Sequence, residues 1–285
     1  MNKGSARLVN ALSIDVEDYF QVSAFEDHIA RTQWDTLPRR VEANTDRVLG
    51  LFDEFGAKAT FFVLGWVAQR HRSLVRRIVE AGHELACHGY SHTRVCRQNR
   101  DEFRQDITDS KTLLEDIAGV AVRGYRAPSY SIDGRSLWAL DELERAGYSY
   151  SSSIYPIRHD HYGMPGAPRF SFRPTQGHLI EIPITTVRVW NTNLPCGGGG
   201  YFRLLPYAVS RWAIRRVNAQ DKQPCVFYFH PWEIDPNQPR QSRVGLKTRF
   251  RHYVNLGRME SRLRELLTDF SWNTMEKVFL TAASQ

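Results

Sequence analysis

The sequence lacks the features that mark membrane-spanning and disulfide-bonded proteins. No stretch approaches the roughly 18 consecutive apolar residues of a spanning helix. Residues 1–7 contain neither the apolar core nor the cleavage site of a signal peptide. The four cysteines, Cys87, Cys96, Cys196 and Cys225, form no C-x-x-C pair, which favours reduced thiols over disulfides. We therefore expect a cytoplasmic protein, and peripheral attachment to the inner membrane stays open.

Acidic residues are too few to balance the basic ones. The 285 residues include 38 Lys and Arg against 31 Asp and Glu, a net charge of +7. This excess favours anionic partners, but no nucleic-acid-binding motif accompanies it, so we expect no nucleic acid partner. Residues 240–258 contain no acidic residue and six Lys or Arg: Arg240, Arg243, Lys247, Arg249, Arg251 and Arg258. This region is either a solvated basic face or a docking surface for an anionic glycan or the phosphate of a lipid-linked sugar.

Segments with strand and helix patterns alternate along the chain. Strand-like runs occupy residues 8–14, 59–64, 85–88, 122–125, 148–150, 179–184 and 225–229, and amphipathic helical patterns separate most of them. This alternation predicts an α/β fold with a mostly parallel sheet, open or closed into a barrel, whose ligands bind at the carboxyl ends of the strands. Residues 151–178 interrupt the pattern as a predicted long loop, and Gly197–Gly200 as a predicted flexible turn.

Two histidines stand at the end of one predicted strand. His88 and His92 follow the apolar run 85–87, and a strand followed by one helical turn would direct both rings at one point. Neutral imidazole is the commonest protein ligand for zinc. No Glu follows His88, which excludes the H-E-x-x-H metalloprotease motif. Two histidines make an incomplete metal site, so further ligands are needed.

An acidic cluster follows the first predicted strand. On extended backbone, Asp15 and Glu17 point to the same side and Asp18 to the opposite side. One carboxylate could complete a metal site with two histidines, and another could accept a proton from water as general base. The alternative is a solvated acidic strand end.

Arg126 and His230 also follow predicted strands. A buried Arg126 could pair with Asp15, or form an ordinary surface ion pair. His230 could act as general acid towards an amine leaving group, or be structural. Four residues with this chemistry at four strand ends favour a metal-dependent hydrolase.

Four ordered motifs then carry a family resemblance. Residues 13–20, 88–92, 126–130 and 229–233 are similar, in this order, to the polysaccharide deacetylases with NodB homology, carbohydrate esterase family 4. Segments 155–160, 230–235 and 251–256 resemble the branch associated with exosortase and exopolysaccharide loci, and the resemblance covers nearly the whole chain.

The resemblance implies a distorted (β/α) barrel over residues 1–235, with a C-terminal basic and helical extension, residues 236–285, packed on it. It implies removal of N-acetyl groups from the amino sugars of an exopolysaccharide or its lipid-linked precursor, with a divalent metal, usually Zn²⁺. By the family pattern, Asp15 is the catalytic base, Arg126 orients it, His230 is the general acid, and His88 and His92 are metal ligands.

The sequence departs from the family pattern at two positions. Val16 follows Asp15 where the family has a second aspartate, so the metal carboxylate must come from Glu17 or Asp18, and the shared side of the strand favours Glu17. Ser151 stands where the branch carries an aspartate that is expected to orient His230. The candidate substrate-binding residues are the aromatic side chains Tyr130, Trp190 and Trp232.

Two alternative functions remain at this point. One is a hydrolase on the same scaffold that cleaves another C–N bond, in a small amide or ureide. The other is a metal-free, catalytically inactive glycan-binding relative, which Ser151 favours and the presence of both His88 and His92 disfavours.

Overall fold

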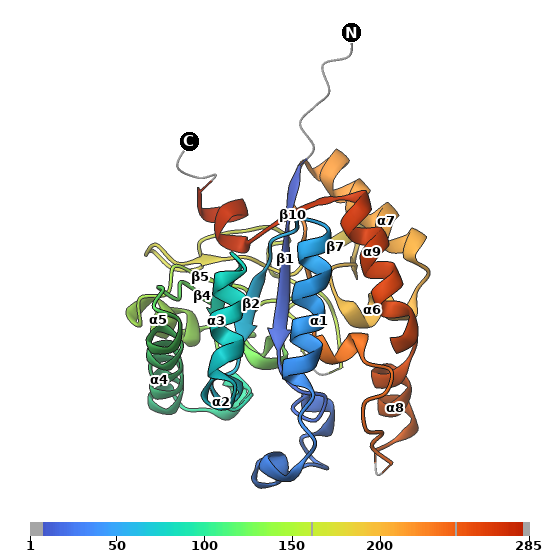
Figure 1. Ribbon diagram of the computed structural model, residues 1–285. Helices are drawn as coiled ribbons and strands as arrows, with labels where there is room; N and C mark the ends of the chain where they lie inside the picture. The colour runs from blue at the N-terminus through green and yellow to red at the C-terminus, as the bar shows by residue number, and fades with distance from the viewer. Residues whose placement is uncertain (1–7, 161, 243, 282–285) are drawn as a thin grey trace.

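A curled parallel sheet runs through the middle of the protein, as Figure 1 shows for the computed structural model, which describes residues 8–160, 162–242 and 244–281. Neighbouring strands follow the order β10-β1-β2-β3-β4-β5-β6, and β9 also pairs with β1. All these pairs are parallel. The strands are β1 (Val9–Val16), β2 (Thr60–Val63), β3 (Glu84–Cys87), β4 (Gly124–Tyr125), β5 (Tyr150–Ser151), β6 (Ile180–Glu181), β9 (Val226–Phe229) and β10 (Ser271–Asn273). The predicted α/β barrel-like fold is confirmed.

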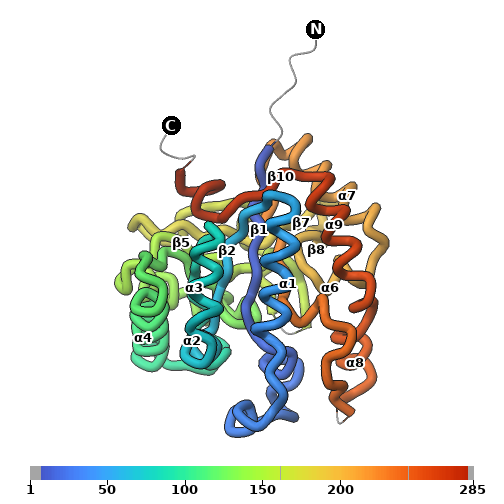
Figure 2. Tube along the Cα trace, in the orientation of Figure 1, coloured from blue at the N-terminus to red at the C-terminus, as the bar shows by residue number. Residues whose placement is uncertain are grey.

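Helices cover the outside of the sheet. In Figure 1 and in the tube of Figure 2, α1 and α3 lie side by side over β1 and β2, while α6, α7 and α9 gather on the other side of β1 from α4. The helices are α1 (Val41–Glu54), α2 (Gly65–Arg70), α3 (Arg72–Glu80), α4 (Arg100–Ala118), α5 (Trp138–Arg145), α6 (Gly199–Leu204), α7 (Tyr207–Arg216), α8 (Leu246–Tyr253) and α9 (Met259–Asp269). Among the described residues, no helix combines the length and the apolarity needed to cross a bilayer.

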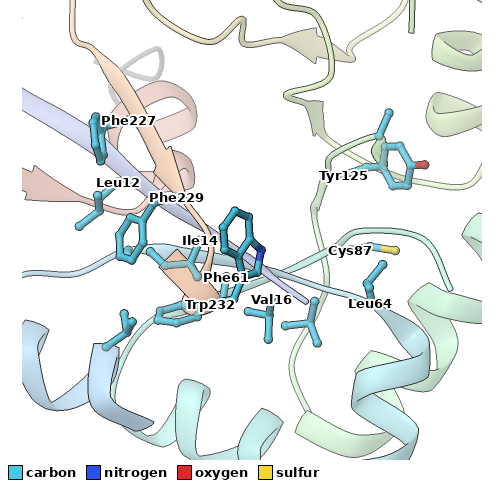
Figure 3. Close-up of a cluster of buried hydrophobic side chains, with 14 of the residues drawn as sticks. Leu12, Ile14, Val16, Phe61, Leu64, Cys87, Tyr125, Phe227, Phe229 and Trp232 are labelled. Carbon is cyan, nitrogen blue, oxygen red and sulfur yellow. The ribbon is translucent and has the colours of Figure 1, made fainter. Parts of the chain in front are cut away.

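Strand β1 pairs with three other strands of the sheet. Its residues Ser13–Val16 pair with β2, Ala11–Ile14 with β9, and Val9–Ala11 with β10. All its residues from Asn10 onward are buried, as expected for a strand with helices over the sheet. Figure 3 shows its apolar side chains Ile14 and Val16 among Phe61, Phe229 and Trp232.

The C-terminal region contributes to this sheet as well as packing on it. After α8 and α9 the chain returns through β10 to lie beside β1. The predicted boundary between residues 235 and 236 stays a prediction, and Arg243 of the basic region lies outside the described residues. A two-stranded antiparallel hairpin, β7 (Thr186–Val189) with β8 (Thr192–Pro195), was not predicted.

The predicted helical turn after His88 is wrong. Gly89 and His92 both have left-handed backbone, with φ of 72° and 53°. The carbonyls of Gly89 and Tyr90 accept hydrogen bonds from the first two amides of α2, Gly65 and Trp66, so they are not used within a local helix. The tight turn, rather than a helix, brings the His92 ring back towards the strand.

The predicted flexible turn at Gly197–Gly200 is also wrong. Gly199 and Gly200 begin α6, and the Gly197 carbonyl accepts a hydrogen bond from the backbone amide of Tyr228 in β9, with an N···O distance of 2.7 Å. A Cβ on Gly197 would lie 2.4 Å from the Val226 carbonyl oxygen. Glycine is present because the backbone packs closely against β9.

Asp18 holds the N-terminus of α1. Its carboxylate accepts hydrogen bonds from the backbone amides of Tyr19 at 2.9 Å, Arg40 at 2.7 Å and Val41 at 3.0 Å, and the residue is fully buried. Arg40 and Val41 carry the amides at the beginning of α1, which have no partner within the helix. Asp18 therefore has a structural role in joining the end of β1 to α1.

We expect Asp18→Ala to lower the free energy of unfolding by about 1–3 kcal/mol, because it leaves buried amides without an acceptor. Urea denaturation followed by circular dichroism measures the change. Glu80→Ala, at the exposed end of α3, is the control and should change stability by less than about 0.5 kcal/mol. Equal stability of the two variants would contradict the structural role.

Candidate active site

Four strands end at the same edge of the sheet, and each delivers a polar side chain there. Asp15 lies near the end of β1, His88 follows β3, Arg126 follows β4 and His230 follows β9. The first three are buried, and the His230 side chain is 21% exposed. Parallel strands place their carboxyl ends together, which is why residues so distant in sequence meet.

Glu17, His88 and His92 form a compact buried cluster. One potential ligand atom from each lies within 4.8 Å of the others. The Nδ1 of His88 is 2.8 Å from the Arg126 carbonyl oxygen, which can only accept, so Nδ1 donates and Nε2 keeps its lone pair. Burial lowers the pKa of His88 to about 4, so its ring is neutral near pH 7. A neutral, oriented imidazole is the form that binds a metal.

Glu17 supplies the carboxylate of this cluster. Its buried Oε2 lies 3.0 Å from His92 Nε2 and makes no other polar contact among the described residues. Its Oε1 accepts a hydrogen bond from Trp232 Nε1 at 3.3 Å. Burial raises the pKa of Glu17, but His92 and His230 outweigh it and hold the pKa at about 2. Two imidazoles and an ionised carboxylate grouped in this way fit a divalent cation such as Zn²⁺. Asp18, the other predicted ligand, points away to the start of α1.

Arg126 and Asp15 form a buried ion pair beside the cluster. Arg126 Nη1 donates to Asp15 Oδ1 at 2.6 Å, while its Nε and Nη2 donate to Ser152 at 3.1 and 3.0 Å. The guanidinium also lies 4.1 Å from the centre of the Phe62 ring. Burial lowers the pKa of Arg126, but the neighbouring Asp15 carboxylate raises it by more. The pKa therefore lies above its usual value, and the guanidinium stays charged. The second Asp15 oxygen, Oδ2, remains free to face His230.

His230 completes the group from the opposite side. Its Nε2 is 3.9 Å from Asp15 Oδ2 and 3.6 Å from Glu17 Oε1, and its Nδ1 is 2.8 Å from Glu233 Oε1. Burial lowers the pKa of His230, but Glu17, Glu233 and Asp15 together raise it to about 9. The ring can therefore carry a proton that faces the space next to Asp15.

The three predicted substrate-binding aromatics have different positions. Tyr130 is buried, with its ring 5.7 Å from the Arg126 guanidinium. Trp232 is buried and stacks on His230 with ring centres 5.1 Å apart. Trp190 is 98% exposed on the turn between β7 and β8, so it packs against none of these residues. The structure brings Tyr130 and Trp232 to the site and leaves Trp190 in solvent.

Two residues of the site, Ser152 and Glu233, were not predicted from the sequence. Ser152 carries no motif of its own, and only its position after β5 could have indicated it. Glu233 had a signal: Pro231 opens a short 3₁₀ helix after His230, so a carboxylate three residues on returns to the histidine. Ser151, which stands at the expected aspartate position, is hydrogen-bonded to Ser153 at 2.8 Å.

Comparison with protein families divides the chain into two parts. Residues 25–150 match the family model described as polysaccharide deacetylase, and residues 152–280 match a domain of unknown function, DUF3473. The two matches meet next to β5 (Tyr150–Ser151). Both therefore contribute residues to the site, with the second containing Ser152, His230 and Glu233.

Curated relatives are similar over part of the chain. A peptidoglycan-N-acetylglucosamine deacetylase of Bacillus cereus is 33% identical over 99 residues, 34% of this chain and 36% of that protein. A chitooligosaccharide deacetylase of Sinorhizobium fredii is 29% identical over 145 residues, 50% of this chain and 61% of that protein. The matched segments thus span less than two thirds of these relatives' own lengths.

Solved structures share the fold over nearly the full chain. A Mycobacterium smegmatis protein provisionally named a polysaccharide deacetylase superposes with a TM-score of 0.63 at 21% identity, covering 100% of this chain and 93% of its own. The PuuE allantoinase superposes with a TM-score of 0.60 at 14% identity, covering 97% and 90%. At these identities the likeness establishes the fold alone.

We expect Arg126→Leu to lower the free energy of unfolding by about 3–5 kcal/mol, because it leaves the Asp15 carboxylate buried and unpaired. The double variant Arg126→Leu/Asp15→Asn should recover a large part of this loss, since the uncompensated charge is removed. Urea denaturation of the three proteins measures both effects.

The exposed pair of Arg135 with Asp133 is the matched control for that experiment. The Arg135 side chain is 79% exposed, so Arg135→Leu should leave the free energy of unfolding nearly unchanged. A loss for Arg126→Leu no greater than that for Arg135→Leu would show that the buried pair does not stabilise the fold.

Proposed function

We propose that the protein is a metal-dependent hydrolase that removes N-acetyl groups from the amino sugars of a polysaccharide, a proposal that the match of residues 25–150 to the polysaccharide deacetylase family model supports. The observation that carries the proposal is the convergence of the Glu17, His88 and His92 cluster with Asp15 and His230 at one edge of the sheet. A likeness of motifs without this convergence would not support catalysis.

Each residue has a role that its contacts support. Glu17, His88 and His92 would hold a divalent ion, for which Zn²⁺ is the best match, and such an ion supplies Lewis-acid activation. Asp15 accepts the proton of the attacking water, with Arg126 fixing the carboxylate through a 2.6 Å hydrogen bond. His230 donates a proton to the departing nitrogen, so that one water and one N-acetyl group give acetate and a free amine.

We further propose an anionic exopolysaccharide or its lipid-linked precursor as substrate, handled at the inner membrane face in the cytoplasm. A surface on α8 supports an anionic partner. Leu246 and Phe250, one helical turn apart, are 81% and 58% exposed, and Lys247 and Arg251 are exposed beside them. An exposed apolar pair flanked by basic residues suits the interface of an anionic bilayer. Asp160 pairs with Lys247 and Arg251 and offsets part of their charge.

The two alternatives make different predictions for this site. Hydrolysis of another C–N bond, in a small amide or ureide, uses the same residues, and the fold shared with an allantoinase does not discriminate between substrates. Kinetic comparison of N-acetylated oligosaccharides with small ureides does so directly. A metal-free glycan-binding relative would bind glycan without the cluster, so its affinity should survive His88→Ala.

We expect the purified protein to bind about one divalent ion per chain and to release acetate from N-acetylated oligosaccharides. His92→Ala should lose both the ion and the activity, because it removes one of three ligands. Asp18→Asn should keep the ion, since the Asp18 carboxylate lies on backbone amides. Elemental analysis and an acetate assay measure these outcomes.

Wild-type protein that binds no ion after zinc addition would contradict the hydrolase proposal. A metal-loaded protein that releases acetate from no N-acetylated glycan would instead favour the small amide or ureide alternative. An ion that is retained in His92→Ala and lost in Asp18→Asn would show that Asp18, and not His92, is a metal ligand.

We expect the protein to sediment with vesicles of phosphatidylcholine and phosphatidylglycerol at low salt, and more weakly with phosphatidylcholine alone. Leu246→Ser/Phe250→Ser should lower binding by about tenfold, because the apolar contact with the interface is lost. Leu137→Ser, at a 41% exposed apolar side chain of another region, is the control. Equal binding by all variants would exclude α8 as the contact surface.

A further inference from the structure

The carboxylate of Glu233 contacts the His230 ring, whereas the Ser151 hydroxyl is hydrogen-bonded to Ser153. We propose that Glu233, itself held by Arg203, is the positioning residue for His230, and that this is one role of the region matching a domain of unknown function. The inference rests on the proposed deacetylase function and adds roles for Glu233 and Arg203 to those given above for the other site residues.

Glu233 fixes both the backbone and the ring of His230. Its Oε1 accepts a hydrogen bond from the His230 amide at 3.0 Å and another from the ring Nδ1 at 2.8 Å. An ionised carboxylate can only accept, so Nδ1 carries a proton and Nε2 faces Asp15 and Glu17. The stacked Trp232 indole, tilted by 20°, holds the plane of the ring. One tautomer and one orientation are thereby selected.

Arg203 in turn fixes Glu233. Both side chains are buried, and Arg203 Nε donates to Glu233 Oε2 at 2.6 Å. The remaining Arg203 nitrogens donate to backbone carbonyls at the end of α8 and just after it: Arg251 at 3.3 Å, His252 at 3.0 Å and Val254 at 2.6 Å. A planar guanidinium with all these partners cannot rotate freely. The relay therefore joins α6, α8 and the general-acid histidine.

Gly199 leaves the space that the Glu233 carboxylate needs. A Cβ on Gly199 would lie 2.3 Å from Glu233 Oε1 and 2.6 Å from Oε2, too close for either oxygen to stay in place. A Cβ on the next residue, Gly200, would meet no atom within 4 Å. The chain thus offers two adjacent glycines of which only one should be sensitive to alanine.

The alternative is that Arg203 and Glu233 have a structural role only, because a buried ion pair can also fix α6 to α8. The leaving group distinguishes the two roles. Cleavage of an N-acetyl group requires a proton on the departing nitrogen, whereas the phenolate released from p-nitrophenyl acetate needs none. A defect in positioning His230 should appear with the first substrate only, and a distorted site should affect both.

We expect Glu233→Gln to lower kcat for an N-acetylated oligosaccharide by about 10- to 100-fold with KM changed less than about threefold. Hydrolysis of p-nitrophenyl acetate should stay within about threefold of wild type, and bound metal should be unchanged. His230→Ala/Glu233→Gln should be no slower than His230→Ala alone, because a positioning residue acts through the histidine. Glu233→Asp should restore part of the kcat.

Gly199→Ala should reproduce the pattern of Glu233→Gln, and Gly200→Ala should behave as wild type. Equal losses on both substrates, a loss of bound metal in Glu233→Gln, or equal behaviour of the two glycine variants would each overturn the positioning role.

A second measurement keeps the inference testable if the wild type deacetylates no glycan. The hydrogen bond from His230 Nδ1 to Glu233 should give a downfield imidazole proton resonance in the NMR spectrum of wild type, absent from both His230→Ala and Glu233→Gln. Its absence from wild type, or its persistence in Glu233→Gln, would overturn the contact itself. If the resonance is present in wild type and lost in both variants, Glu233 stays the positioning residue of His230 even where the assay has excluded N-acetylated glycans as substrates.

Discussion

The buried ion pair of Arg126 with Asp15 is the interaction on which the site depends. Arg126 lies after β4, yet it contacts Asp15 on β1, Ser152 after β5 and, through its carbonyl, His88 after β3. One side chain and its own backbone therefore set the relative positions of four strand ends. Burial of two charges is costly, and the cost is offset because the guanidinium finds acceptors for its nitrogens and rests on the Phe62 ring.

The three carboxyl groups at the end of β1 and just after it have separate tasks, because each of them meets different partners. Asp15 and Glu17 point into the site, where one meets a permanent cation and the other meets imidazoles. Asp18 points outward and satisfies backbone amides at the start of α1. An acidic cluster that looks redundant in sequence is thus divided into a candidate base, a candidate metal ligand and a helix cap.

The strand ends could be predicted from the sequence because they follow apolar runs bounded by glycine, and their convergence follows from parallel pairing. Because Glu17 was expected on the same side of the strand as Asp15, it was also predicted as the metal carboxylate in preference to Asp18. The structure groups Glu17 with the two histidines. Local backbone could not be predicted: the turn at Gly89 is set by hydrogen bonds to α2, and the packing of Gly197 by β9. Glu233 and Ser152 were missed because their importance lies in partners far from them in sequence. Strand β10 is only three residues long and had no detectable pattern.

The pairing of β1 has a consequence for how the chain folds. Strand β1 is made first, but two of its three neighbours, β9 and β10, come from the other end of the chain. During synthesis, the backbone groups of β1 that pair with β9 and β10 therefore stay unpaired until those two strands have emerged. Such non-local pairing slows folding and prolongs the exposure of an apolar strand edge. The same residue order that gathers the site from both ends of the sequence makes the protein dependent on protection of its first strand while it is synthesised.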